Sequence, residues 1–148
     1  MRKFKEMKEN NKGFSLVELI IVIAIMAVLV GVLAPQFIKY VESSKQSTDI
    51  QNAAEIRAAV EAYVAEQAPT ADVTVSVNNA QITVAGGDVG TALTEVGLSS
   101  TIPTKSTGWA ANATAVEVAK YDVDTFAWST TSRENTKNPK KDLADAFE

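Results

Sequence analysis

The chain contains no cysteine and no histidine among its 148 residues. Without cysteine it cannot form a disulfide or a thiolate nucleophile, and without either residue it lacks a Cys/His zinc site and a Ser-His-Asp triad. These absences exclude most familiar hydrolase chemistry. We therefore predict no catalytic residue, no metal ligand and no cofactor-binding residue, and we do not expect an enzyme.

Charge is missing from one long stretch. Between Glu18 and Lys39 no side chain is charged, and Gln36 is the only plainly polar one. At ~1.5 Å per helical residue this run is long enough to cross a hydrocarbon layer of ~30 Å, so it predicts a membrane segment. Glu18 is unusual at its outer edge, because a charged side chain inside a membrane helix costs roughly 2.5–3.5 kcal/mol.

The remaining charge is unevenly distributed. Residues 1–13 carry five basic and two acidic side chains, a net charge of +3, whereas residues 14–148 carry nine basic and 16 acidic ones, a net charge of −7. Lysines before the first hydrophobic segment hold that end in the cytoplasm, so the carboxyl end is carried outside. The acidic body repels phosphate backbones, and we predict no direct nucleic-acid binding.

The segment Lys12-Gly13-Phe14-Ser15-Leu16-Val17-Glu18, with basic residues before it and an aliphatic helix after it, resembles the type IV pilin precursors and their pseudopilin relatives. The resemblance implies a leader peptide, residues 1–13, that is cut between Gly13 and Phe14. It also implies N-methylation of Phe14, and it makes Glu18 the family's glutamate. Pro35 lies where many pilins carry a helix-interrupting proline.

The resemblance covers residues 12–40 strongly, extends to about residue 67 and is absent beyond. It implies a structural subunit of a type IV pilus, stored as a single-pass membrane precursor in contact with lipid and then assembled into an extracellular filament, a helical homopolymer. The implied partners are copies of the chain itself, a prepilin peptidase/methyltransferase, and a membrane assembly platform with its ATPase. Adhesion, twitching motility, protein secretion and DNA uptake are not distinguished as outcomes.

Other interpretations of the same residues stay open. A pseudopilin of a type II secretion or competence machine would carry the same leader. An ordinary secretory signal would be cut near Ala34, and an uncut anchor would carry an extracellular binding domain or enzyme. Ser15 and Glu18 also fit a capping box, which stabilises a helix start by typically ~1 kcal/mol.

Glu18 and Pro35 are the predicted assembly residues. Cleavage creates a positively charged amine on Phe14, and a misaligned subunit would leave one buried charge unpaired at a cost of ~3–5 kcal/mol, so Glu18 is expected to set register between subunits. Pro35 removes the hydrogen bond to the carbonyl of Gly31, which predicts a bend or local opening near residues 31–36. An ordinary kink without mechanical purpose is the alternative.

After Lys39 the composition turns polar while the helical period continues. Apolar residues fall on one face at three- and four-residue spacing: Ile50, Ala53, Ile56, Val60, Tyr63 and Val64. We predict one helix from about Phe14 to Gln67, with a membrane half at 14–38 and an amphipathic half at 39–68. Residues 43–49 are the least apolar part and are expected to face solvent.

The predicted fold is α+β, with the long helix packed against a small antiparallel sheet formed by residues 69–132. Residues 73–77 and 80–84 alternate around Asn78-Asn79 and predict a hairpin. Residues 89–96 predict a short helix that carries Leu93 and Val96 inward, and 99–113 predict a loop anchored by Trp109. Two more strands are expected at 115–119 and 125–129, with four inward candidates: Val116, Val118, Phe126 and Trp128. The polar tail, 133–148, is either a mobile end or a last helical turn on the head.

Overall fold

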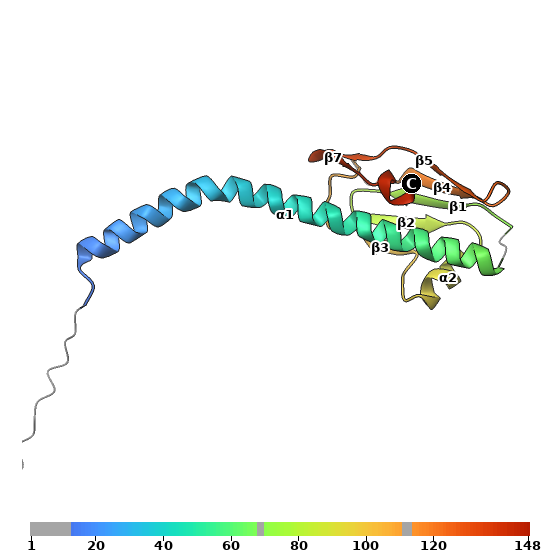
Figure 1. The fold of residues 1–148 in the computed structure, drawn as a ribbon, viewed down its shortest axis with the longest axis horizontal. Coiled ribbons are helices and arrows are strands. Elements are labelled where there is room, and N and C mark those ends of the chain that lie inside the picture. Colours follow the sequence, from blue (N-terminus) through green and yellow to red (C-terminus); the bar gives the residue numbers. More distant parts are fainter. Residues whose placement is uncertain (1–12, 68–69, 111–113) are drawn as a thin grey trace, which may run out of the picture. The chain divides into compact units, whose positions relative to one another are not determined.

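A computed structural model describes residues 13–67, 70–110 and 114–148 (Figure 1). The chain divides into two units, Met1–Ile38 and Lys39–Glu148, and we describe each by itself. We call the second unit the head. The predicted leader lies outside the described residues except for Gly13, so its fold stays a prediction.

The first unit contains the start of α1, an α-helix that runs from Leu16 to Gln67. The helix begins two residues later than the predicted Phe14. Pro35 lies inside the helix, and the α-helical conformation continues through residues 31–36 without interruption. The helix is therefore not interrupted there, and the predicted bend at residues 31–36 stays a prediction.

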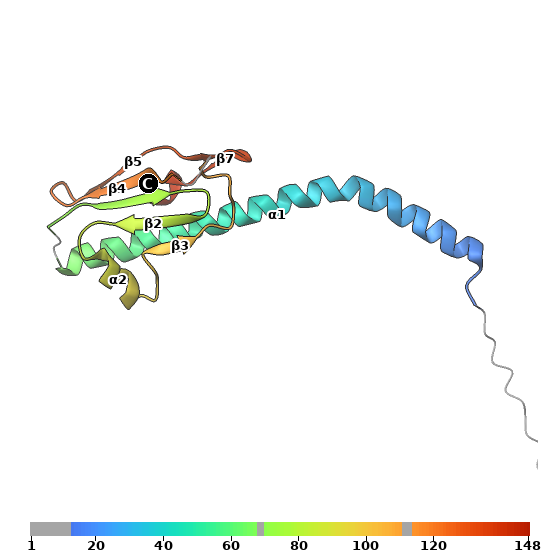
Figure 2. The same ribbon diagram turned by 180° about the vertical axis from the view of Figure 1, so that it is seen from behind.

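The head contains a five-stranded antiparallel sheet with the strand order β3-β2-β1-β4-β5. Figures 1 and 2 show the sheet from its two sides, with residues 39–67 of α1 lying across one face. The predicted α+β class, a long helix against a small antiparallel sheet, is confirmed. The strands are β1 (Val73–Val77), β2 (Gln81–Ala85), β3 (Thr101–Pro103), β4 (Val116–Asp122) and β5 (Ala127–Thr130).

The predicted hairpin is present as β1 and β2. The Asn78 side-chain oxygen accepts hydrogen bonds from the backbone N–H groups of Ala80 and Gln81, both at 2.8 Å, and this contact closes the turn. Alternate side chains of β1 are buried, as the period-two pattern requires of a strand with one covered face. The hairpin is thus fixed locally, by its turn residue and its alternation.

The short helix is α2, Val89–Glu95, and its end is set by Gly97. The Gly97 N–H donates to the Thr94 carbonyl at 3.0 Å and the Leu98 N–H donates to the Leu93 carbonyl at 2.7 Å. With Gly97 at φ +77°, this is a Schellman cap, which favours glycine. Leu93 is buried as predicted, but Val96 follows the helix at its C-cap and is 56% exposed, so its inward assignment is wrong.

The core lies between the sheet and residues 39–67 of α1. The predicted apolar face of the helix is confirmed: Ala53, Ile56, Val60 and Val64 are buried and Ile50 and Tyr63 pack against the core at its margin. The sheet contributes Val73, Val75, Val77, Ile82, Val84 and Val118 to the same cluster.

The prediction that residues 43–49 face solvent holds for Ser44, Lys45, Ser47 and Thr48, which are exposed, but not for the whole segment. Gln46 and Asp49 are fully buried although both are polar, because the head packs on this turn of α1 as well. Their neighbours Ser47 and Thr48 donate side-chain hydrogen bonds to carbonyls four residues earlier, which keeps those hydroxyl groups on the helix. The contact between the head and α1 therefore begins earlier along the helix than the predicted apolar face, which starts at Ile50.

The strand predictions need three further corrections. Residues 101–103 form β3 within the segment predicted as a loop, and they pair with β2. Val116 is only partly buried, whereas Val118 is buried and Trp128 packs against the core. Phe126 was expected to point inward, but it lies in the β4–β5 turn at φ +55° and is 72% exposed.

The carboxyl-terminal segment is part of the head. It forms β6 (Glu134–Asn135), β7 (Asn138–Asp142) and a 3₁₀ helix at Ala144–Phe147, labelled η1. Leu143, Ala144, Ala146 and Phe147 are buried in the core. Of the two predicted alternatives, the helical turn packed on the head is the one present, and the preceding hairpin was not predicted.

Candidate processing and assembly site

The residues at the predicted cleavage point adopt no regular secondary structure. Gly13, Phe14 and Ser15 precede the first turn of α1, and the Phe14 side chain is 90% exposed. A Cβ placed on Gly13 would meet no atom within 4 Å. Among the described residues, nothing crowds the Phe14 side chain or the position of a Cβ on Gly13.

A capping box stands directly after that bond. The Ser15 N–H donates to Glu18 Oε2 at 2.9 Å, and the Val17 N–H donates to Ser15 Oγ at 3.4 Å. The Ser15 carbonyl accepts the first helical hydrogen bond, from the Leu19 N–H at 3.1 Å, which makes Ser15 the N-cap residue. The capping interpretation of Ser15 and Glu18 is thus present in the structure, and it occupies one of the two carboxylate oxygens.

The helix after this box is apolar and uncovered. Large hydrophobic side chains from Leu16 to Ile38 are more than 50% exposed almost throughout, on every side of the helix. By length and composition, α1 is able to cross a membrane. A helix that is apolar all round needs lipid or other helices around it, because about 25 cal/mol per Å² is lost when such surface faces water.

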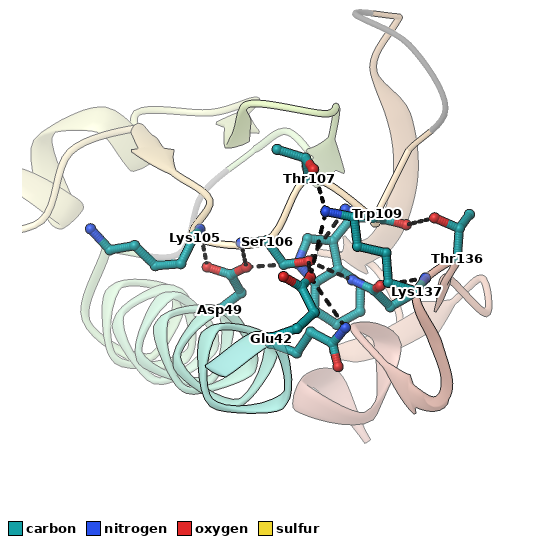
Figure 3. A network of polar contacts seen from close by, with 11 residues as sticks. Glu42, Asp49, Lys105, Ser106, Thr107, Trp109, Thr136 and Lys137 are labelled. Atoms are coloured by element: carbon teal, nitrogen blue, oxygen red, sulfur yellow. Dashed lines mark hydrogen bonds and ion pairs between the residues drawn. The ribbon is translucent and has the colours of Figure 1, made fainter. Parts of the chain in front are cut away.

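A buried carboxylate, that of Asp49, connects the head to α1 (Figure 3). Asp49 accepts three hydrogen bonds: from the Lys105 N–H at 2.6 Å, the Ser106 N–H at 2.8 Å and the Trp109 indole N–H at 2.7 Å. Trp109 is fully buried, as expected of an anchor for the loop. A buried charge is tolerated when it is fully hydrogen-bonded, so this contact fixes the loop to the helix.

A second polar group extends the contact to Glu42, about two helical turns before Asp49 (Figure 3). Ser106 Oγ donates to Glu42 Oε1 and accepts from the Asn135 side-chain amide at 3.0 Å. Lys137 adds a hydrogen bond to Thr107 Oγ1 at 2.9 Å and lies 3.9 Å from Glu42 Oε1. Helix α1, the 104–109 loop and the β6–β7 turn are thus joined by side chains far apart in sequence.

The acidic residues Asp122 and Asp124 lie at the turn between β4 and β5 and carry no assignment. Asp122 Oδ1 accepts hydrogen bonds from the Asp124 and Thr125 N–H groups, which makes this acidic pair a closed turn. These N–H groups hold the Asp122 pKa below its usual value, the Thr125 N–H most strongly. Over the ranges 13–67, 70–110 and 114–148, no three potential ligands are grouped to hold a metal ion.

Comparison with known proteins addresses the amino-terminal segment first. Residues 8–34 match the family described as the prokaryotic N-terminal methylation motif. The match includes Gly13, Phe14, the capping box and the helix as far as Ala34.

Named relatives point the same way. The chain is 43% identical over 88 residues to the prepilin peptidase-dependent protein A of Clostridium perfringens, covering 59% of this chain and 60% of the relative. It is 38% identical over 58 residues to the type IV major fimbrial protein FimA of Dichelobacter nodosus, which covers 39% and 37% of the two chains. The same identity and length relate it to the type IV major pilin PilA of Myxococcus xanthus, over 39% and 26%.

By these matches the amino-terminal part of the chain is similar to type IV pilin precursors. It spans 60% or less of the length of the relatives given above. No solved structure matches it significantly.

The structure brings together some of the predicted site residues and separates others. Gly13 and Phe14 directly precede α1 and Glu18 lies in its first turn, whereas Pro35 lies more than four helical turns after Glu18. Asp49 and Glu42, which hold the head on the helix, were not predicted. Their signal was two acidic residues seven apart on an otherwise apolar face, which also describes ordinary solvent-exposed helix charges.

Proposed function

We propose that this chain is the structural subunit of a type IV pilus, processed after Gly13, N-methylated on Phe14 and assembled through its apolar amino-terminal helix. The observation that carries the proposal is the fully exposed apolar helix with a single carboxylate at its start, inside a segment that matches the methylation motif. A subunit of this kind acts mechanically, and we propose no catalysis for it.

The helix supports assembly because its surface has no use within the folded chain. The large side chains from Leu16 to Ile38 are exposed rather than packed against other described residues. Packing against identical helices therefore adds van der Waals contact that lipid tails do not match in density. We propose that membrane lipid surrounds this helix before assembly and that copies of the chain replace lipid afterwards. The head remains outside the membrane, on an extracellular filament.

Glu18 supplies the register in this proposal. Its Oε2 accepts from Ser15, and its Oε1 stays available to the charged amine that cleavage creates on Phe14 of another subunit. The Clostridium relative is named as a prepilin peptidase-dependent protein, which supports a prepilin peptidase as a partner of this chain. A membrane assembly platform and its ATPase complete the proposed machinery. Pro35 is proposed to loosen its turn only in the filament, where neighbouring helices can satisfy the freed carbonyl.

The test begins with the amino terminus of the chain recovered from cells that contain the peptidase and the assembly motor. Methylated Phe14 together with a sedimenting polymer is the expected result. A mature chain that still starts at Met1 would point to an uncut anchor with an extracellular binding domain, and a start near Pro35 would point to ordinary secretion. A processed chain that forms only short assemblies would favour a pseudopilin.

The variant Glu18→Ala separates processing from assembly. It keeps Ser15 Oγ on the Val17 N–H and removes only the Glu18 acceptor of the Ser15 N–H, so leader removal should slow by only about twofold. The amine of each added subunit would be left buried and unpaired, which costs ~3–5 kcal/mol and lowers the assembly equilibrium by more than about a hundredfold. Pelleting of sheared filaments measures the yield, and a normal yield from this variant would refute the role of Glu18.

A further inference from the structure

We infer that Ser15 is a positioning residue for leader removal: its hydroxyl ends the helix where it does and so keeps the carbonyl of the bond to be cut free. The inference rests on the proposed processing after Gly13. It starts from the hydrogen-bond partner of a single backbone group, the Val17 N–H.

In an α-helix each N–H donates to the carbonyl four residues earlier. If α1 continued toward the amino terminus, the Val17 N–H would donate to the Gly13 carbonyl, which belongs to the peptide bond predicted to be cut. In the structure the Val17 N–H donates instead to Ser15 Oγ, at 3.4 Å. Ser15 therefore takes the donor that would otherwise hold the Gly13 carbonyl inside a helical turn.

The other half of the capping box acts in the same direction. In a longer helix the Ser15 N–H would donate to the carbonyl of residue 11, but it donates to Glu18 Oε2 at 2.9 Å. Both donors that would draw residues 11–14 into the helix are thus satisfied by side chains. Gly13 and Phe14 are left without regular structure, and Phe14 is 90% exposed.

This matters for hydrolysis because the reacting atom is the Gly13 carbonyl carbon. Water adds to that carbon, the bond to the Phe14 nitrogen breaks, the nitrogen leaves with a proton as the new amine, and Gly13 keeps a carboxylate. A carbonyl tied into a helix presents neither its oxygen to donors of an enzyme nor its carbon to water. Ser15 acts before chemistry, by setting the fraction of precursor in which the bond is presented.

Three variants at position 15 separate this role from recognition of the hydroxyl by the peptidase. Alanine is a poor N-cap and threonine keeps the hydroxyl. Glycine lacks the hydroxyl, but it ends a helix nearly as well as serine because its backbone disfavours the helical conformation. Ser15→Ala should lower kcat/KM for leader removal by about twofold to fivefold, through KM, because the cap is worth typically ~1 kcal/mol. Ser15→Gly and Ser15→Thr should both stay within about twofold of the parent chain.

The experiment uses the full-length chain in detergent micelles with membranes containing a prepilin peptidase, and follows cleavage by mass spectrometry. A spectroscopic readout accompanies it. Gly13-Phe14 is the only Gly-Phe pair in the sequence, so carbonyl-¹³C glycine with ¹⁵N phenylalanine gives one NMR signal from the bond to be cut. That carbonyl signal should move toward its helical position in Ser15→Ala and stay in place in Ser15→Gly.

Each outcome decides between the explanations. Equal kcat/KM for Ser15→Ala and the parent chain, or an unmoved carbonyl signal, overturns the inference. Slow cleavage of Ser15→Gly with an unmoved carbonyl signal also overturns it, because the enzyme would then be reading the hydroxyl itself. A parent chain that the peptidase does not cut after Gly13 is a different result, since it refutes the proposed processing whatever the variants do.

Discussion

At the scale of single residues, the head depends on one buried acid. Asp49 is fully buried and accepts hydrogen bonds from two backbone N–H groups and the Trp109 indole (Figure 3). Each donor left without a partner in the interior costs about 1–3 kcal/mol. The Asp49 carboxylate therefore stabilises the head mainly by accepting these three hydrogen bonds, and less through its charge.

We predict that Asp49→Ala destabilises the chain by at least about 3 kcal/mol, because it strands these donors and leaves a gap beside Trp109. Urea denaturation in detergent, followed by tryptophan fluorescence, measures the free energy of unfolding. Glu55→Gln is the matched control on the same helix, where the side chain is exposed and the expected change is within about 0.5 kcal/mol. Equal midpoints for the two variants would contradict the structural role of Asp49.

Gly108 is required for space. A Cβ at this position would lie 2.1 Å from Asn135 Oδ1, and Asn135 is buried and hydrogen-bonded to Ser106. Gly108→Ala should thus displace Asn135 and destabilise the head by about 1–3 kcal/mol. Gly90→Ala should do the reverse, by about 0.5–1 kcal/mol, because Gly90 lies inside α2 with nothing within 4 Å. Thermal unfolding of both variants checks the opposite signs.

At the scale of elements, what could be predicted depended on how local its cause is. The β1–β2 hairpin and the end of α2 follow from Asn78 and Gly97, which act on neighbours within a few residues. The apolar face of α1 follows from its spacing. The predicted start of α1, Phe14, is two residues too early. The Ser15–Glu18 capping box places the first helical residue at Leu16.

The errors at this scale have different causes, and one of them is non-local. The local sequence predicts Asp49 to face solvent, but the groups that donate to it belong to residues 105–109. No pattern near Asp49 indicates a contact with that distant segment. Phe126 looked like core because it is large and apolar, but the turn closed by Asp122 puts it at φ +55° with its side chain outside. Residues 138–142 pair with β6 despite Pro139, at the edge of a two-stranded sheet.

The carboxyl-terminal segment gives a prediction for this scale. Phe147 is 1% exposed and stacks against Trp128 with ring centroids 5.0 Å apart, so Phe147→Ala should cost about 3–5 kcal/mol. Phe126→Ala makes the same chemical change at an exposed position and should stay within about 0.5 kcal/mol. Unfolding midpoints of the two variants at equal detergent concentration compare them directly. A small loss for Phe147→Ala would mean that η1 is detached in solution.

At the scale of the whole molecule, an apolar helix and an acidic head have different requirements. The helix is indifferent to pH along its uncharged run, whereas the head carries carboxylates whose pKa values are shifted by folding. The Lys120 side chain, 2.6 Å away, is the largest cause that lowers the pKa of Asp72, and the Val123 N–H adds to it. The Asp72 side chain is only partly buried, so water and salt screen much of this effect.

Asp142 is the better placed of these groups. Burial by itself would raise its pKa, but the Ser132 hydroxyl and the Ala144 and Arg133 N–H groups donate to the carboxylate and bring the pKa below its usual value. A carboxyl whose pKa is lowered by folding adds stability above its unfolded pKa, about 4, and loses it as the pH falls through the folded value. The head should therefore weaken below about pH 4.

We predict that the unfolding midpoint of the full-length chain is nearly constant from pH 7 to pH 5 and falls steadily between about pH 4 and pH 2. Asp142→Asn is the informative variant, because the remaining oxygen can still accept from the Arg133 and Ala144 N–H groups, both of which donate to Oδ1. It removes the titration while it keeps the geometry, so its midpoint should be lower at pH 7 and should fall less on acidification. Urea titrations at each pH, in one detergent and at constant ionic strength, measure both curves. Parallel curves for the parent chain and the variant would show that Asp142 does not contribute to the acid sensitivity of the head.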